Sequence, residues 1–207
     1  MSLNANYLQE LSAIFVADVR GSAHYAKLSK KEQEEFSAKV REEKAQGLHP
    51  LLPGANEREL KRLSSAFQEE LGIVLPDAVV EVLSQVDGFV ENGVSLYGVD
   101  PEFRDDHFES GPAILSENHV YWSDYADTAR RYLFLGDSDL WFFVIDLNDA
   151  LPLALDRGRL LPKHRFDSVE EMVNDMMRQA LSYSVDEEEA NSRKDLENPP
   201  GNLFSRN

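Results

Sequence analysis

The sequence contains no cysteine, which excludes disulfide bonds, a catalytic thiol and thiolate metal sites. It also has no apolar run that approaches the roughly eighteen residues a membrane-spanning helix needs. The first residues, MSLNANYLQELSA, have neither the basic start nor the apolar core of a signal peptide. We therefore expect a cytoplasmic protein with no membrane partner.

Basic residues are scarce in the middle of the chain. The 207 residues carry a formal net charge of −17, and positions 64–129 hold 14 acidic residues but a single base, Arg104. Such a surface repels nucleic acid, because duplex binding needs basic side chains that face phosphates. It attracts a basic protein and speeds the encounter with it. The alternative is that the acidic residues only keep the protein soluble.

Catalytic motifs are missing as well. The patterns G-x-S-x-G, G-x-G-x-x-G and Gly-Lys-Ser/Thr do not occur. Residues 136–138 (Gly-Asp-Ser) are similar to the serine block of GDSL esterases, but no Asp-x-x-His supplies a base, so a polar hairpin loop is the better interpretation. Residues 105–107 (Asp-Asp-His) could ligate a metal, yet adjacent residues rarely all point at one ion. We expect no enzyme activity, no metal site and no cofactor.

The first fifty residues predict a helical arm. Gly21-Ser22 interrupts the helical pattern, which leaves open whether the arm is one kinked helix or two. The stretch from Ser29 to Glu32 is a capping box that starts a helix ending near Gly47, and a proline- and glycine-rich corner follows at 47–55. We expect an arm at 1–50, a main domain at 51–183 and an acidic, loosely ordered tail at 184–207. The apolar stripe of the arm, at spacings of three and four, consists of Leu8, Leu11, Phe15 and Val19.

The main domain reads as helices followed by strands. A helix should begin at Asn56 and end at Gly72, and Pro76 suits the first turn of a second, shorter helix that ends at Asp87-Gly88. Both helices have one apolar face that needs a cover. Strands joined by short turns favour an antiparallel sheet, and Gly-Asp-Ser-Asp at 136–139 should be a hairpin loop. The expected strands cover 94–99, 131–136, 140–146, 151–156 and 159–166, with a last helix after Asp167.

The order of these features resembles a known family. The segments ELKRLSSAFQEELGIVLP, DAVVEVLSQVDGF, YLFLGDSDLWFFVIDL and FDSVEEMVNDMM follow one another as in the SUKH superfamily, which includes the yeast cell-wall-assembly regulators of the Smi and Knr type. Within this superfamily, the sequence resembles the bacterial YrhA-like branch. The resemblance covers roughly residues 55–182, and it departs from the usual Asn-Gly-Gly turn at residues 87–89, which read Asp-Gly-Phe.

The resemblance implies an α+β fold, with a curved, mainly antiparallel sheet packed against helices. It also implies a binding role, since many bacterial members act as immunity proteins that neutralise toxin domains, often nucleases. We therefore expect a non-enzymatic domain that binds a basic protein such as a nuclease-type toxin. A general regulatory interaction module and a hydrolase that uses the acidic loop are the alternatives. The expected partner-binding residues are Asp87, Glu91, Asp100, Glu102, Phe103, Asp105, Asp106, Phe108 and Glu109.

Overall fold

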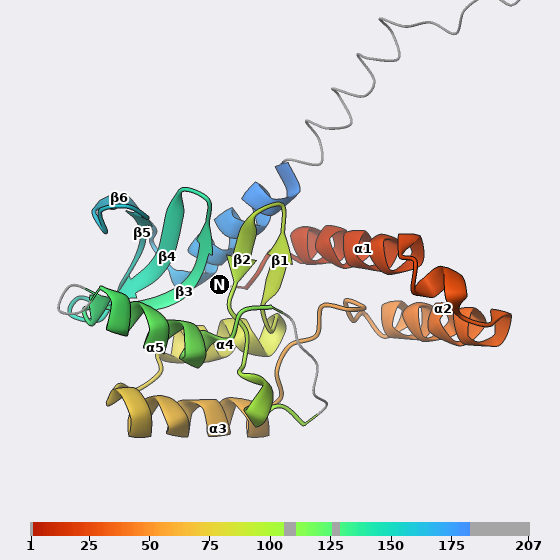
Figure 1. The fold of residues 1–207 in the computed structure, drawn as a ribbon, viewed down its shortest axis with the longest axis horizontal. Coiled ribbons are helices and arrows are strands. Elements are labelled where there is room, and N and C mark those ends of the chain that lie inside the picture. The colour runs from red at the N-terminus through yellow and green to blue at the C-terminus, as the bar shows by residue number, and fades with distance from the viewer. Residues whose placement is uncertain (1, 106–110, 126–128, 183–207) are drawn as a thin grey trace, which may run out of the picture.

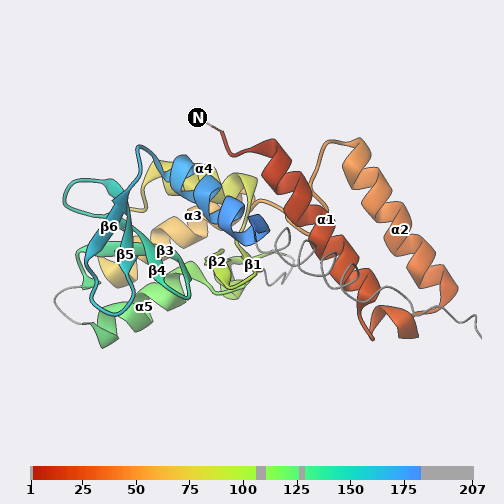
Figure 2. The same cartoon turned by 90° about the horizontal axis from the view of Figure 1, so that it is seen from above.

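The chain folds into an α+β domain from which a two-helix arm projects (Figures 1 and 2). The computed structural model describes residues 2–105, 111–125 and 129–182. The domain contains one open, curved, antiparallel sheet of six strands that packs against helices, so the expected fold class is confirmed. Within the described residues, no helix is both long and apolar enough to cross a membrane.

The helices begin where the sequence places its caps. The Ser29 hydroxyl accepts the Glu32 amide at 3.3 Å while the Glu32 carboxylate accepts the Ser29 amide at 2.7 Å, and Asn56 and Glu59 form a second box of this kind. The helical elements are α1 (Ala5–Gly21), the 3-10 turn η1 (Tyr25–Lys27), α2 (Lys30–Ala45), α3 (Glu57–Ala66), the π-helical turn η2 (Phe67–Leu71), α4 (Asp77–Gln85), the 3-10 turn η3 (Pro101–Phe103), α5 (Ile114–Asp124) and a C-terminal helix described over 169–182.

The arm consists of two helices rather than one kinked helix. Its first helix joins the arm to the domain, because Leu8 and Leu11 of α1 belong to the main hydrophobic core. The Ser12 hydroxyl donates to the Pro50 carbonyl at 2.6 Å, which ties α1 to the corner that follows α2. Helix α2 buries Val40 alone among its residues and lies mostly in solvent. The arm is therefore fixed to the domain by α1 and leaves most of α2 exposed.

The six strands form a meander in which each strand pairs with the next one along the chain. The expected four-residue hairpin loop at 136–139 is wrong, because β3 continues through Ser138 and only Asp139 and Leu140 make the connection. Strand β1, which was not expected, pairs with β2 across the Asn92-Gly93 turn. The strands are β1 (Phe89–Glu91), β2 (Val94–Leu96), β3 (Tyr132–Ser138), β4 (Trp141–Asp146), β5 (Leu151–Asp156) and β6 (Pro162–Arg165).

A bulge in β3 decides which side chains face each side of the sheet. The Phe134 ring lies 4.7 Å from that of Tyr121 on α5, so it faces α5. The register shifts between Phe134 and Gly136, and a side chain at Gly136 would come within 2.4 Å of Met176 on the C-terminal helix. The two faces of the sheet are thus covered by different helices, and the bulge returns Asp137 to the α5 face.

Candidate functional site

The predicted acidic segment does not form one exposed surface. Asp87 is completely buried and makes an ion pair with Arg104, whose side chain is 2 % exposed. Its carboxylate also accepts the Val99 amide at 2.6 Å. The expectation that Asp87 faces a partner is therefore wrong. Arg104, the one base of its region, is the internal partner of this carboxylate rather than part of the surface.

Asp100 is also buried and has a structural role. Its two carboxylate oxygens accept the backbone amides of Leu115 and Ser116, both at 2.9 Å, and the Ser116 hydroxyl at 2.6 Å. These amides belong to the first turn of α5, where backbone donors lack partners within the helix and a negative charge is favourable. Asp100 therefore caps α5 from a distant part of the chain, and its assignment to a partner-binding surface is wrong.

The other described residues of this segment lie nearer the surface. Asp105 is exposed and pairs with Arg62 of α3 at 2.6 Å, and this bond lowers the pKa of its carboxyl group. Glu91 is half-buried, and burial, together with the charge of Asp18 on α1, raises its pKa. Glu102 is exposed, whereas Phe103 packs partly against the core. The remaining expected residues, Asp106, Phe108 and Glu109, lie outside the described residues.

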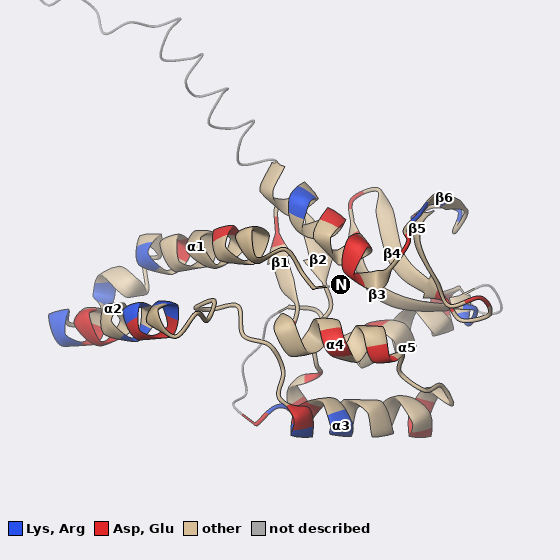
Figure 3. Ribbon diagram, turned by 180° about the vertical axis from the view of Figure 1, so that it is seen from behind, with Lys and Arg blue, Asp and Glu red and all other residues tan. Residues whose placement is uncertain are grey.

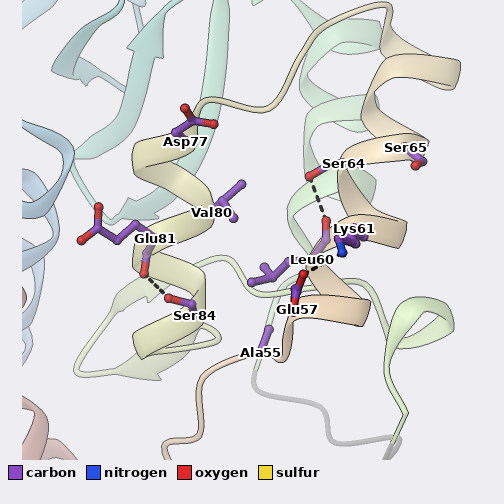
Figure 4. Close-up of a pocket in the computed structure, with 10 residues that line it drawn as sticks. All are labelled: Ala55, Glu57, Leu60, Lys61, Ser64, Ser65, Asp77, Val80, Glu81 and Ser84. Atoms are coloured by element: carbon purple, nitrogen blue, oxygen red, sulfur yellow. Dashed lines mark hydrogen bonds and ion pairs between the residues drawn. The ribbon is translucent and has the colours of Figure 1, made fainter.

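A groove lies between α3 and α4 (Figure 4). Its volume is about 760 Å³. Leu60 of α3 and Val80 of α4 point toward one another across it, and Ala55 closes one end. The hydroxyl groups of Ser64 and Ser84 donate to carbonyls of their own helices, at 2.8 and 2.7 Å. The floor is therefore apolar and bordered by small side chains.

The rim of this groove is acidic. Asp77 and Glu81 extend outward from α4 and leave the floor uncharged, while Glu57 on α3 is paired with Lys61 at 2.6 Å. Figure 3 shows acidic positions on both helices. Arg62 of α3 does not line the groove and bonds Asp105 in the neighbouring loop. A cationic side chain near this rim would thus meet a net negative charge.

The corner between the two helices contains the glycine and the proline that the sequence indicates. Gly72 has a φ of 72°, the left-handed conformation that favours glycine, and it ends the π-helical turn as expected. Pro76 lies immediately before α4, one residue ahead of its expected place in the first turn. Between them, Val74 is 76 % exposed. Val74 does not line the groove, and a single exposed apolar side chain is ordinary on a protein surface.

A second cluster of polar groups lies on the α5 face of the sheet. The bulge places Asp137 opposite Ser95, and Arg157 pairs with its carboxylate at 3.0 Å. Burial raises the pKa of Asp137, although Arg157 opposes the shift. The hydroxyls of Tyr97 and Tyr121 lie 3.0 Å apart, and burial raises the pKa of Tyr121 to about 12. These polar groups form hydrogen bonds and an ion pair with one another, so we interpret the cluster as a structural network.

Ser138 lies in the sequence block that is similar to the GDSL esterases. Ser138 is buried, and its hydroxyl accepts the Trp141 amide at 3.2 Å, which is a turn-forming role. Among the described residues, no group of three or more metal-ligating side chains is close enough to hold an ion. What the arrangement can do is bind: an apolar groove with an acidic rim can accept a segment that carries apolar and basic side chains.

The groove residues were not identified as a site from the sequence. The apolar positions of α3 and α4 were expected to be buried. The small residues between them, such as Ser64 and Ser84, could have indicated a groove between the two helices. No protein-family model matches the chain, and a search of the curated proteins gives no match. The groove geometry is therefore the main guide to function.

Proposed function

We propose that this chain is a non-enzymatic, SUKH-type protein-binding domain that captures a basic protein, and that the partner is a nuclease-type toxin held inactive by the complex. The observation that carries the proposal is the open apolar groove between α3 and α4, with its acidic rim. The formal net charge of −17 and the family resemblance described above support it.

The groove and the charge contribute to binding in different ways. Burying the exposed part of Val80, which lines the groove, would stabilise a complex at roughly 25 cal/mol per Å² of apolar surface removed from water. The rim acids Asp77 and Glu81 would add long-range attraction, which mainly raises the association rate. Affinity would thus come from the floor, and speed and selectivity for a basic partner would come from the rim.

A nuclease is a natural partner for such a surface. Proteins that act on nucleic acid carry lysine and arginine residues that face the phosphates. An acidic surface placed against those residues would compete with the substrate for the same charges. A regulatory interaction module would use the same groove on a different partner, so the activity of the captured protein separates the two functions.

The test begins with affinity capture of the chain and its bound protein from the natural host. The captured protein is assayed for cleavage of RNA and DNA, with and without an excess of the chain. We expect cleavage that the chain suppresses. A bound protein without nuclease activity would support the regulatory alternative, and the absence of a bound protein would contradict both.

A charge reversal then tests the site. Glu81→Lys should lower the association rate roughly tenfold at low salt, and the difference should shrink as salt screens the rim charge. The matched control is Glu34→Lys on α2, an exposed helical glutamate near the free end of the arm, with the same change in net charge. Equal effects of the two variants would show that net charge, and not the groove, controls association.

A further inference from the structure

A second hollow lies at the base of the arm. It has a volume of about 570 Å³ and is formed by α2, the corner after it and the end of α4. Leu48 and Phe36 both line this hollow. Leu48 is 54 % exposed, and Phe36 is half-buried. Other residues that line the hollow are Val40, Leu52, Pro53 and Gln85.

The two concave surfaces meet at one point. Ser84 lines both the α3–α4 groove and the arm hollow. Beside it, Gly54 lies so close to α4 that a side chain there would come within 2.0 Å of the Ser84 carbonyl oxygen. The backbone at Gly54 therefore packs directly against the end of α4, where the two hollows meet.

The two hollows differ in charge. At the arm hollow, Lys39 and Glu43 of α2 lie 3.7 Å apart and offset one another. The α3–α4 groove has an acidic excess at its rim, since Asp77 and Glu81 outweigh the Glu57–Lys61 pair. An occupant of both hollows would therefore be basic where it follows α3 and α4 and apolar where it reaches the arm.

We propose that the two hollows form one binding surface, which receives a single amphipathic helix of the basic partner. This inference rests on the proposed function and specifies what the partner presents. The long walls of the surface are α2, α3 and α4, whose backbone groups are bonded within each helix, so strand addition has no edge to use there. A helix, with anchors at i, i+3 or i+4 and i+7, can fill such a surface through side chains alone.

The inference gives the arm a role in binding. Helix α1 is fixed to the core through Leu11, and α2 follows it on the exposed side. The arm thus holds Leu48 and Phe36 at a set position beside the groove. The different charges of the two hollows would orient the bound helix, because its basic part would lie near Glu81 and its apolar part near Leu48.

Photo-crosslinking in the natural host tests this arrangement. The photoreactive residue benzoylphenylalanine replaces Lys61 in the groove, Leu48 at the arm hollow, or Leu161 as a control, each in the full chain. Leu161 is 52 % exposed and lies before β6, away from both hollows. We expect Lys61 and Leu48 to mark one stretch of about fifteen residues or fewer in the same protein, at helical spacing. Leu161 should not mark that stretch.

The outcomes separate the two proposals. If Lys61 marks a partner and Leu48 marks nothing or a different protein, the shared surface is refuted and the groove function stands. If neither position marks a protein, both proposals fail. Crosslinks to every second residue of the partner would indicate that it binds as a strand, and they would refute the proposal that it binds as a helix.

Point variants provide a second, independent measurement. Leu48→Asp should weaken binding of the captured partner at least about tenfold, because it places a charge where the apolar end of the helix is buried. Leu161→Asp has a nearly equal starting exposure and should leave the dissociation constant unchanged. Equal dissociation constants for the two variants would refute the arm hollow as part of the surface.

Discussion

The buried ion pair between Asp87 and Arg104 offers the sharpest test of how the domain is held together. Both side chains are almost fully removed from water, at 0 % and 2 % exposed. The pair joins the end of α4 to the segment after η3, and Asp87 also accepts the Val99 amide. Arg104→Met removes the positive charge but keeps most of the side-chain volume, so the carboxylate of Asp87 loses its buried counter-charge.

The expected cost follows from that burial. Removing one partner of a buried ion pair typically lowers the free energy of unfolding by about 3–5 kcal/mol, because the other charge stays in a poorly polarisable interior. In the double variant Asp87→Asn/Arg104→Met, no charge is left behind, and the asparagine oxygen can still accept the Val99 amide. The double variant should therefore be more stable than Arg104→Met alone.

Urea unfolding followed by tryptophan fluorescence measures these free energies, since Trp122 and Trp141 are both half-buried reporters. The control is Arg62→Met, which removes the partner of Asp105 from a partly exposed pair and should change stability little. A loss below about 1 kcal/mol for Arg104→Met, the range of exposed ion pairs, would refute the argument from burial. A double variant less stable than Arg104→Met would refute the argument from the unpaired charge.

Two further predictions concern Glu117 of α5 and the arm. Burial raises the pKa of Glu117 in the folded protein, so this group contributes stability at acidic pH that is lost as the pH rises through the raised value. Between about pH 4 and pH 7, the free energy of unfolding of Glu117→Gln should therefore fall less than that of the wild type, and parallel curves would contradict this. Leu11→Ala should cost about 2–5 kcal/mol, because Leu11 is fully buried where α1 meets the domain. Val120→Ala, at a half-exposed position on α5, should change stability by no more than about 0.5 kcal/mol, and an equally small loss for Leu11→Ala would mean that the arm is not part of the core.

The sequence by itself determined the local structure. The caps at Ser29 and Asn56, the helix end at Gly72 and the apolar face of the C-terminal helix were all predicted and are confirmed. These features depend on contacts between residues three or four apart, which the order of residues specifies directly. The antiparallel order of the strands was also predictable, because short turns leave few other connections.

Tertiary structure alone decided which acidic residues are buried and where the groove lies. Asp87 and Asp100 read as surface charges, but a guanidinium and two helix amides from elsewhere in the chain bind them inside the domain. The apolar stripes of α3 and α4 are buried as predicted, but the groove that leaves Val80 partly exposed between the helices depends on how the helices meet. Such outcomes depend on contacts between distant residues, and the spacing of residue types along the chain does not specify them.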